Sequence, residues 1–410
     1  MDLKVRVLLV MTVAAATLWL GGCGHYICDH TFGNASCTAS GSGFSQGGGS
    51  SAPGAYLYAV DQAGTIDGYA YNPSTSSFAA IPSYTAPTIP ANLPGTGMVV
   101  AQKQYLYTVF ASLGQIYGWS INSSGELTAI SGSPFSAGYL VGNPEAGTWG
   151  VITNPAGTLL FVADTSGESV YVYQIGSGGV LTVVSGAPFS VPFFPGNMGT
   201  DGQGKYLYVT QEVASQEVAA YSIGSSGSLT AVPGSPFAAP LGQVQGDASG
   251  DFLIGIPNDS ADTVGLYVYS ITQSGTTAGA ITAVSGSPFS TTYMPASFVV
   301  QPESGGNQVY TFGLNATETA YGPVEGFTLS STGALTEDSG SPFSGVGNGW
   351  WGQIDQSGAY VFVYAGYDYS SNEVVEQISP LVVGSGGALT QPVGTISLTT
   401  PGYWVVTDPN

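Results

Sequence analysis

Tyr56-Leu57-Tyr58 is the first copy of a short aromatic and aliphatic segment that returns along the whole chain. The further copies are Tyr105-Leu106-Tyr107, Leu159-Leu160-Phe161, Tyr206-Leu207-Tyr208, Phe252-Leu253-Ile254, Gln308-Val309-Tyr310 and Tyr360-Val361-Phe362. The first residues of successive copies are 49, 54, 47, 46, 56 and 52 positions apart. A period near fifty built from short strands is typical of propeller blades rather than of helical solenoid units. Seven copies therefore predict a seven-bladed β-propeller.

One repeat predicts the strand order of a blade, with strands at 149–153, 159–163, 170–175 and 181–184. The first two strands are joined by the turn Asn154-Pro155-Ala156-Gly157. The same turn recurs at Asp201–Gly204, Asp247–Gly250 and Asp355–Gly358. Asp or Asn at the first position bonds the turn backbone, and Gly at the fourth takes the positive φ that other residues resist. These carboxylates are therefore predicted to form turns, not to catalyse.

The two ends of the propeller predict how the ring closes. Residues 403–410 match a first strand and the opening of the same turn, and Gly54 with the segment 55–58 supplies the second strand. One blade then contains strands from both ends, which removes the free sheet edges that invite aggregation. The predicted fold is all-β: seven four-stranded antiparallel blades in a closed ring over residues 54–410.

The first 53 residues predict export. Lys4 and Arg6 precede an apolar run over 7–20 that is typical of a signal peptide and too short to span a bilayer. The run ends in Leu20-Gly21-Gly22-Cys23, which resembles a bacterial lipobox. We therefore expect cleavage after residue 22 and lipidation of Cys23, with Gly24 favouring the outer membrane. Residues 23–53 would form a stalk and a flexible Gly/Ser linker that separates the propeller from the membrane.

The other two cysteines, Cys28 and Cys37, lie in the same stalk. In an oxidising compartment this even pair predicts a disulfide. Such a bond would order the stalk and leave the propeller core unaffected.

The charge of the chain limits its partners. After removal of residues 1–22, two Lys, no Arg and 24 acidic residues remain. Phosphate backbones and anionic lipid surfaces would be repelled, so we expect no nucleic-acid partner and membrane contact only through the lipid anchor. A glycan, a peptide or another neutral or cationic ligand remains compatible with the sequence. We expect a monomer. The simplest explanation of the many acidic residues is that their charge keeps the protein in solution, which requires no cationic partner.

Several blade segments resemble the lactonase-like seven-bladed propellers, which include 6-phosphogluconolactonase-type and muconate-cyclising enzymes with YVTN-type repeats. These segments are Leu160-Phe161-Val162-Ala163-Asp164, Ser169-Val170-Tyr171-Val172-Tyr173 and Gly179-Val180-Leu181-Thr182. The resemblance implies the architecture and a site of His, Arg and acidic residues at the channel mouth. The chain departs from that site, because His25 and His30 precede the propeller and Arg6 lies in the signal. A general base would have to be a carboxylate with a raised pKa.

No catalytic residue, metal site or cofactor is therefore predicted. The candidate ligand face combines aromatic and acidic residues on the loops that enter the first strands and on those that join the second to the third. Its members are Trp149, Trp350, Trp351, Tyr403, Trp404, Asp164, Glu168, Glu212, Asp259 and Asp368. The favoured hypothesis is a lipid-anchored envelope or cell-surface propeller that acts as a binding module. A lactonase-type hydrolase with an atypical site and a structural envelope protein remain as alternatives.

Overall fold

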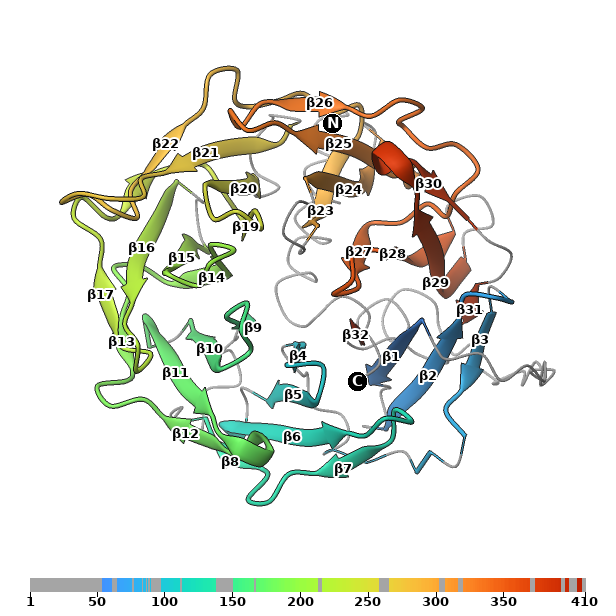
Figure 1. The fold of residues 1–410 in the computed structure, drawn as a ribbon, viewed down its shortest axis with the longest axis horizontal. Helices are drawn as coiled ribbons and strands as arrows, with labels where there is room; N and C mark the ends of the chain where they lie inside the picture. The colour runs from blue at the N-terminus through green and yellow to red at the C-terminus, as the bar shows by residue number, and fades with distance from the viewer. Residues whose placement is uncertain are drawn as a thin grey trace, which may run out of the picture.

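The computed structural model shows a closed ring of seven antiparallel sheets (Figure 1). It describes residues 54–407 except for 61–64, 76, 83, 86, 88, 90–96, 111–112, 138–149, 166, 213–215, 258–264, 302–306, 316–319, 369–372, 392–394 and 398–403. Helical structure within these ranges amounts to two 3-10 turns, η2 (Ser177–Gly179) and η3 (Ser385–Gly387). The predicted all-β seven-bladed propeller is confirmed. The predicted signal peptide, Cys23 and the pair Cys28 and Cys37 lie outside the described residues.

The blades are numbered here in chain order. Blade 1 contains β1 (Ala55–Val60), β2 (Ile66–Asn72), β3 (Ser77–Ala80) and β32 (Trp404–Thr407). Blade 2 contains β4 (Met98–Ala101), β5 (Tyr105–Phe110), β6 (Gln115–Ile121), β7 (Leu127–Ala129) and β8 (Phe135–Ser136). Blade 3 contains β9 (Val151–Thr153), β10 (Leu159–Asp164), β11 (Ser169–Ile175), β12 (Leu181–Val183) and β13 (Phe189–Ser190).

Blade 4 contains β14 (Pro195–Thr200), β15 (Tyr206–Gln211), β16 (Glu217–Ile223), β17 (Leu229–Ala231) and β18 (Phe237–Ala238). Blade 5 contains β19 (Gln243–Gly246), β20 (Phe252–Ile256), β21 (Tyr267–Ile271) and β22 (Ile281–Ala283). Blade 6 contains β23 (Met294–Val300), β24 (Gln308–Leu314), β25 (Glu325–Leu329) and β26 (Leu335–Glu337). Blade 7 contains β27 (Trp351–Ile354), β28 (Tyr360–Asp368), β29 (Glu373–Val383), β30 (Leu389–Thr390) and β31 (Ile396–Ser397).

Blades 2, 3, 4 and 7 differ from the prediction by a short fifth strand. In blades 2, 3 and 4 it starts at the Phe of a recurring three-residue segment whose proline follows a cis peptide bond. These segments are Ser133-Pro134-Phe135, Ala187-Pro188-Phe189 and Ser235-Pro236-Phe237. It pairs with the third strand beyond the point where the fourth strand has ended, as Val170 with Phe189 shows. Backbone groups of the third strand that the fourth does not reach are satisfied in this way.

The repeated segments that begin with Tyr56-Leu57-Tyr58 form the second strands of the blades. They are mainly apolar because a second strand is buried on both faces. Every residue of β1, β10 and β20 is buried. Their side chains form core clusters that each join two neighbouring blades, seven clusters among the described residues. One cluster joins Leu57 of blade 1 to Phe362 of blade 7, so the apolar core is continuous around the ring.

The ring closes as the sequence predicts. β1 pairs with β32 in antiparallel register from Tyr56 opposite Thr407 to Ala59 opposite Trp404. β32 thus becomes the innermost strand of blade 1, nearest the centre of the ring (Figure 1). The first and last described strands therefore share one sheet.

Candidate functional site

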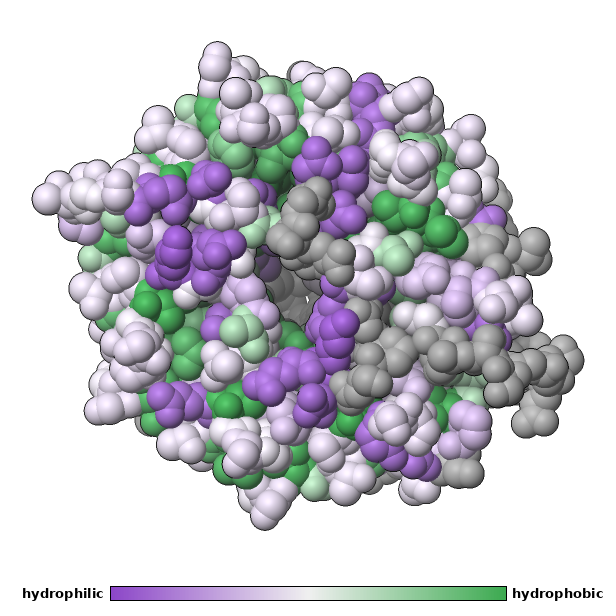
Figure 2. Space-filling view, viewed as in Figure 1, coloured by the Kyte–Doolittle hydropathy of each residue, from purple (hydrophilic) through white to green (hydrophobic). Residues whose placement is uncertain are grey.

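Two faces of the ring differ in the loops that form them. The loop face carries the segments that enter the first strands and those that join second strands to third strands. The turn face carries the turns between first and second and between third and fourth strands. The first strand of each blade lies nearest to the centre of the ring (Figure 1). Figure 2 shows the ring hollowed at its centre, with hydrophilic residues along part of the rim.

The acids that recur in the turns of the turn face are structural. Asp201 Oδ1 accepts hydrogen bonds from the backbone N–H groups of Lys205 and Tyr206, both at 2.7 Å. Asp355 Oδ1 accepts the same bond from Tyr360 at 2.7 Å, and Gly204 and Gly358 have φ of 66° and 69°. Burial raises the pKa of Asp201, although these backbone bonds act to lower it. The prediction that these carboxylates form turns is confirmed.

The predicted ligand face is only partly described. Trp149, Asp259 and Tyr403 lie outside the described residues, as do the side chains of Trp404 and Asp368. Asp164 is buried, and its Oδ1 accepts a hydrogen bond from Gly167 N at 2.9 Å, so it closes the turn after β10. Glu168, two residues before Val170, is exposed and has a φ of 45° in that turn.

Two tryptophans of the predicted face lie side by side at the start of blade 7. The ring centroids of Trp350 and Trp351 are 6.5 Å apart at 72°. Trp350 is half-buried and packs against Tyr364, at 6.3 Å between ring centroids. Trp351 leaves 39% of its surface exposed. Of this pair, Trp351 is the one that offers a free surface for contact.

Glu212 is the acid of the loop face whose surroundings best fit a reactive group. It follows β15, and its backbone N–H donates to Phe194 O at 2.9 Å, which fixes it beside the segment entering the innermost strand of blade 4. Its side chain is half-buried, and burial raises its pKa. Phe194 itself is 46% exposed. A carboxylate and an exposed aromatic residue thus lie at neighbouring backbone positions on the loop face, next to the start of the innermost strand of blade 4.

Polar side chains without a sequence motif hold this region in place. The Thr210 hydroxyl accepts a hydrogen bond from Asn197 N at 2.9 Å and donates to Gly242 O at 3.1 Å, linking blades 4 and 5. Gln243 Nε2 donates to Ala296 O at 2.9 Å, linking blades 5 and 6. Sequence reasoning missed these residues because single Thr, Asn and Gln residues in strands carry no recognisable spacing. Their one signal is a polar residue inside an otherwise apolar strand.

Two other acids with a raised pKa have different roles. Glu325 is buried and accepts hydrogen bonds from Thr292 N at 2.7 Å and Tyr293 N at 3.1 Å, so it ties the loop before β23 to β25. Burial raises its pKa despite these bonds. Asp338 lies between blades 6 and 7, and burial raises its pKa as well. Within the described ranges, no three His, Cys, Asp or Glu side chains gather in a way that could hold a metal ion.

The fold is shared with solved structures, although no protein-family model and no curated protein sequence matches the chain. A putative 6-phosphogluconolactonase from Bacteroides fragilis aligns with a TM-score of 0.60 at 16% identity, over 88% of this chain and 100% of that chain. The periplasmic gluconolactonase of Pseudomonas aeruginosa aligns with a TM-score of 0.60 at 13% identity, over 87% and 99%. This chain has the fold of the lactonase-like propellers. The resemblance read from the blade segments is confirmed at the level of fold.

This lactonase-like propeller has few cationic groups to offer a ligand. Residues 54–410 contain no His and no Arg, and their only lysines are Lys103 and Lys205. Both lysines lie in turns between first and second strands, on the turn face. Among the described residues, no helix is long and apolar enough to cross a membrane.

Proposed function

We propose that the chain is a hydrolase of uncharged sugar lactones, with Glu212 as its general base. The observation that carries this proposal is that a half-buried carboxylate of raised pKa lies beside an exposed aromatic residue on the loop face of a lactonase-like ring. The solved protein from Pseudomonas aeruginosa with this fold is named a periplasmic gluconolactonase. This reverses the preference for a binding module that the composition suggested.

The raised pKa of Glu212 suits the chemistry. A general base works best when its pKa approaches the operating pH, and burial moves Glu212 in that direction. In the ionised form it would take a proton from water while the oxygen of that water attacks the lactone carbonyl. Collapse of the tetrahedral intermediate breaks the ring C–O bond, and the proton passes to the leaving alkoxide. The product is the open hydroxy acid.

The charge of the ring supports a neutral substrate. A phosphorylated lactone carries a dianionic group that proteins bind with Arg or with clustered cations. The chain has a formal charge of −21, and its propeller contains two lysines and no Arg. Such a field opposes the approach of an anion. We therefore expect glucono-1,5-lactone to be hydrolysed and 6-phosphogluconolactone to remain at the spontaneous rate.

The test compares two acids of the loop face. With the purified full chain, proton release from glucono-1,5-lactone should exceed the spontaneous rate. Glu212→Gln should lower the enzymatic rate by about 10²–10⁴-fold, while Glu168→Gln, which changes an exposed acid, should not. The wild-type rate should rise with pH as Glu212 ionises, with a midpoint above the usual pKa of Glu. Equal activity of wild type and Glu212→Gln would exclude this base.

A binding function is the second candidate, favoured by the exposed rings of Trp351 and Phe194. Aromatic faces stack well on sugar rings because they offer a large contact area at low entropic cost. If the lactone assay shows no turnover, glycans should be titrated against Trp351→Ala and the wild type. Loss of binding in the variant would favour a glycan-binding module.

We also propose export and lipid anchoring, which rest on the segment Leu20–Cys23 and the linker behind it. Cys23→Ser should leave the protein unlipidated, so that it no longer partitions with membranes. Membrane association that survives this change would rule out the lipid anchor. The disulfide between Cys28 and Cys37 remains a prediction, and mass analysis with and without reductant would test it.

A further inference from the structure

The contacts between blades repeat around the ring with one side chain in a fixed role. We call the contact of a second strand with the next blade's turn between third and fourth strands a seam. In four seams the first residue of the repeated segment is aromatic, and its ring covers a glycine of positive φ. A Cβ on that glycine would come within 2.6 Å of the ring in each pair: Tyr56 and Gly125, Tyr105 and Gly179, Tyr206 and Gly279, Phe252 and Gly333.

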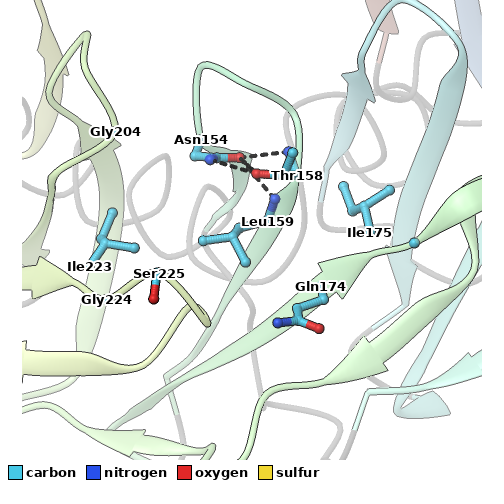
Figure 3. Close-up of a pocket in the computed structure, with 10 residues that line it drawn as sticks. Asn154, Thr158, Leu159, Gln174, Ile175, Gly204, Ile223, Gly224 and Ser225 are labelled. Atoms are coloured by element: carbon cyan, nitrogen blue, oxygen red, sulfur yellow. Dashed lines mark hydrogen bonds between the residues drawn. The ribbon is translucent and has the colours of Figure 1, made fainter.

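The seam between blades 3 and 4 lacks this ring. Leu159 stands in its place and reaches Gly227, where a Cβ would lie 2.8 Å from the leucine side chain. The seam contains a pocket of about 380 Å³, in the size range of small-molecule sites. Its apolar lining is Leu159, Ile175 and Ile223, and its polar lining includes Asn154, Thr158, Gln174 and Ser225 (Figure 3). The pocket therefore lies where the shorter side chain replaces a ring.

The seam between blades 1 and 2 shows what such a space accepts. There the hydroxyl of Tyr56 donates to Ser123 O at 3.0 Å. The turn that supplies this carbonyl is closed by Gly125 N bonding to Asn122 O at 2.9 Å. The turn beside the pocket is closed in the same way, by Gly227 N bonding to Gly224 O at 2.8 Å. Ser225 thus occupies the position of Ser123, and it lines the pocket.

We propose that the pocket between blades 3 and 4 binds a phenolic ring, with its hydroxyl donating to the carbonyl of Ser225. The ring would pack on Leu159 and on the turn of blade 4, as Tyr56 packs on the turn of blade 2. The site is separate from Glu212, because it lies among the turns between first and second and between third and fourth strands. It does not depend on the proposed hydrolase activity. The phenol comes from a small molecule or from a tyrosyl side chain, which share this chemistry.

The test uses p-cresol, which is the tyrosine side chain alone, and calorimetric titration of the full chain. We expect one site, which Leu159→Tyr should close because the new ring would take the place proposed for the phenol. The same variant should melt about 2 °C higher, since it buries additional apolar surface. If Leu159→Tyr does not fold, Leu159→Phe, which copies Phe252, serves instead. Binding of p-cresol that persists in a folded filled variant would overturn the proposal.

The chain offers a matched control in the next seam. Tyr206→Leu copies the leucine of blade 3 into blade 4, and should raise the number of p-cresol sites from one to two. An unchanged stoichiometry in the folded variant would show that the leucine position does not create the site. Toluene should bind at least tenfold more weakly than p-cresol, and equal binding would overturn the role of the Ser225 carbonyl. N-acetyltyrosinamide then separates the sources: binding comparable to p-cresol indicates a tyrosyl side chain, and exclusion indicates a small phenol.

Discussion

The seam between blades 4 and 5 and the seam between blades 6 and 7 have the same backbone plan and opposite chemistry. In the first, Tyr206 and Val232 cover Gly279. In the second, Gln308 and Asp338 hold the equivalent positions and cover Gly387. Both polar side chains are only 7% exposed. The repeat therefore dictates where a side chain lies, while its polarity varies from seam to seam.

The polar seam has a specific cost. Asp338 Oδ1 accepts a short hydrogen bond from the Thr328 hydroxyl, at 2.5 Å. Its other oxygen and Gln308 Oε1 are buried and without a hydrogen-bond partner among the described residues. Two buried acceptors that lack donors destabilise a protein. A proton on Asp338 would reduce this cost, which agrees with the direction of its pKa shift.

Opening the seam that closes the ring should have the largest effect. Deletion of residues 404–410 removes β32, which pairs with β1 at four positions. Each backbone group left unpaired in an apolar setting costs about 1–3 kcal/mol, and the stability of a folded domain is about 5–15 kcal/mol. We expect an insoluble or unfolded product in expression and circular-dichroism assays. Cooperative melting near the wild-type temperature would contradict the role of β32 in closure.

Making the apolar seam polar should have the next largest effect. Val232→Asp places a carboxylate at a position that is 3% exposed and lined by Tyr206. A buried charge without a partner costs about 3–5 kcal/mol. Urea titration should show this loss at pH 7. The reverse change, Asp338→Val with Gln308→Tyr, copies the apolar seam into the polar one and should not destabilise the ring.

Removing one tyrosine hydroxyl tests a bond that both seams share. Tyr208 donates to Gly279 O at 3.1 Å, and Tyr310 donates to Gly387 O at 3.0 Å. Tyr208→Phe and Tyr310→Phe should each cost about 1–2 kcal/mol, because a buried carbonyl loses its donor. Phe161 already holds this position in blade 3, so the fold tolerates the change. A loss above about 3 kcal/mol in either variant would show that more than this bond is involved.

The smallest effect should be a difference in pH dependence between the two seams. Burial and then the neighbouring charge of Glu337 raise the pKa of Asp338. The folded protein thus keeps this proton to a higher pH than the unfolded chain does. The contribution of Asp338 is therefore most favourable below the usual aspartate pKa and is lost as the pH rises through the raised value. Asp338→Val should flatten the fall in stability over this range, whereas the matched change Val232→Ala should keep the wild-type slope.

The sequence predicts the architecture well because the same physical demand recurs seven times. Segments such as Leu207 and its neighbours must be apolar on both faces, since blades pack against both. The turn acids were also predicted, because Asp201 satisfies backbone donors only four and five residues away. The fifth strands were not, since two residues such as Phe135–Ser136 carry no periodicity.

The candidate site was less predictable because it depends on contacts between distant residues. Glu212 was recognised as a member of an acidic set, but its raised pKa results from burial beside the segment that contains Phe194. No spacing in the chain reports that burial. The sequence did not predict the pocket at Leu159 either. The one feature that could have indicated it is a leucine at a position where most copies of the repeat have an aromatic residue.

The pairing of β1 with β32 also determines how the ring responds to mechanical force. Tyr56 and Thr407 face each other at the end of the ladder that holds the start of β1 and the end of β32. Tension that separates residues 55 and 407 would therefore break the hydrogen bonds one pair at a time. Tension between residues 55 and 404, which lie at opposite ends of the ladder, would instead load all the bonds together. A propeller that is attached through its N-terminal side alone experiences neither of these two tensions. A single tether at that side therefore leaves the closing strands β1 and β32 without load.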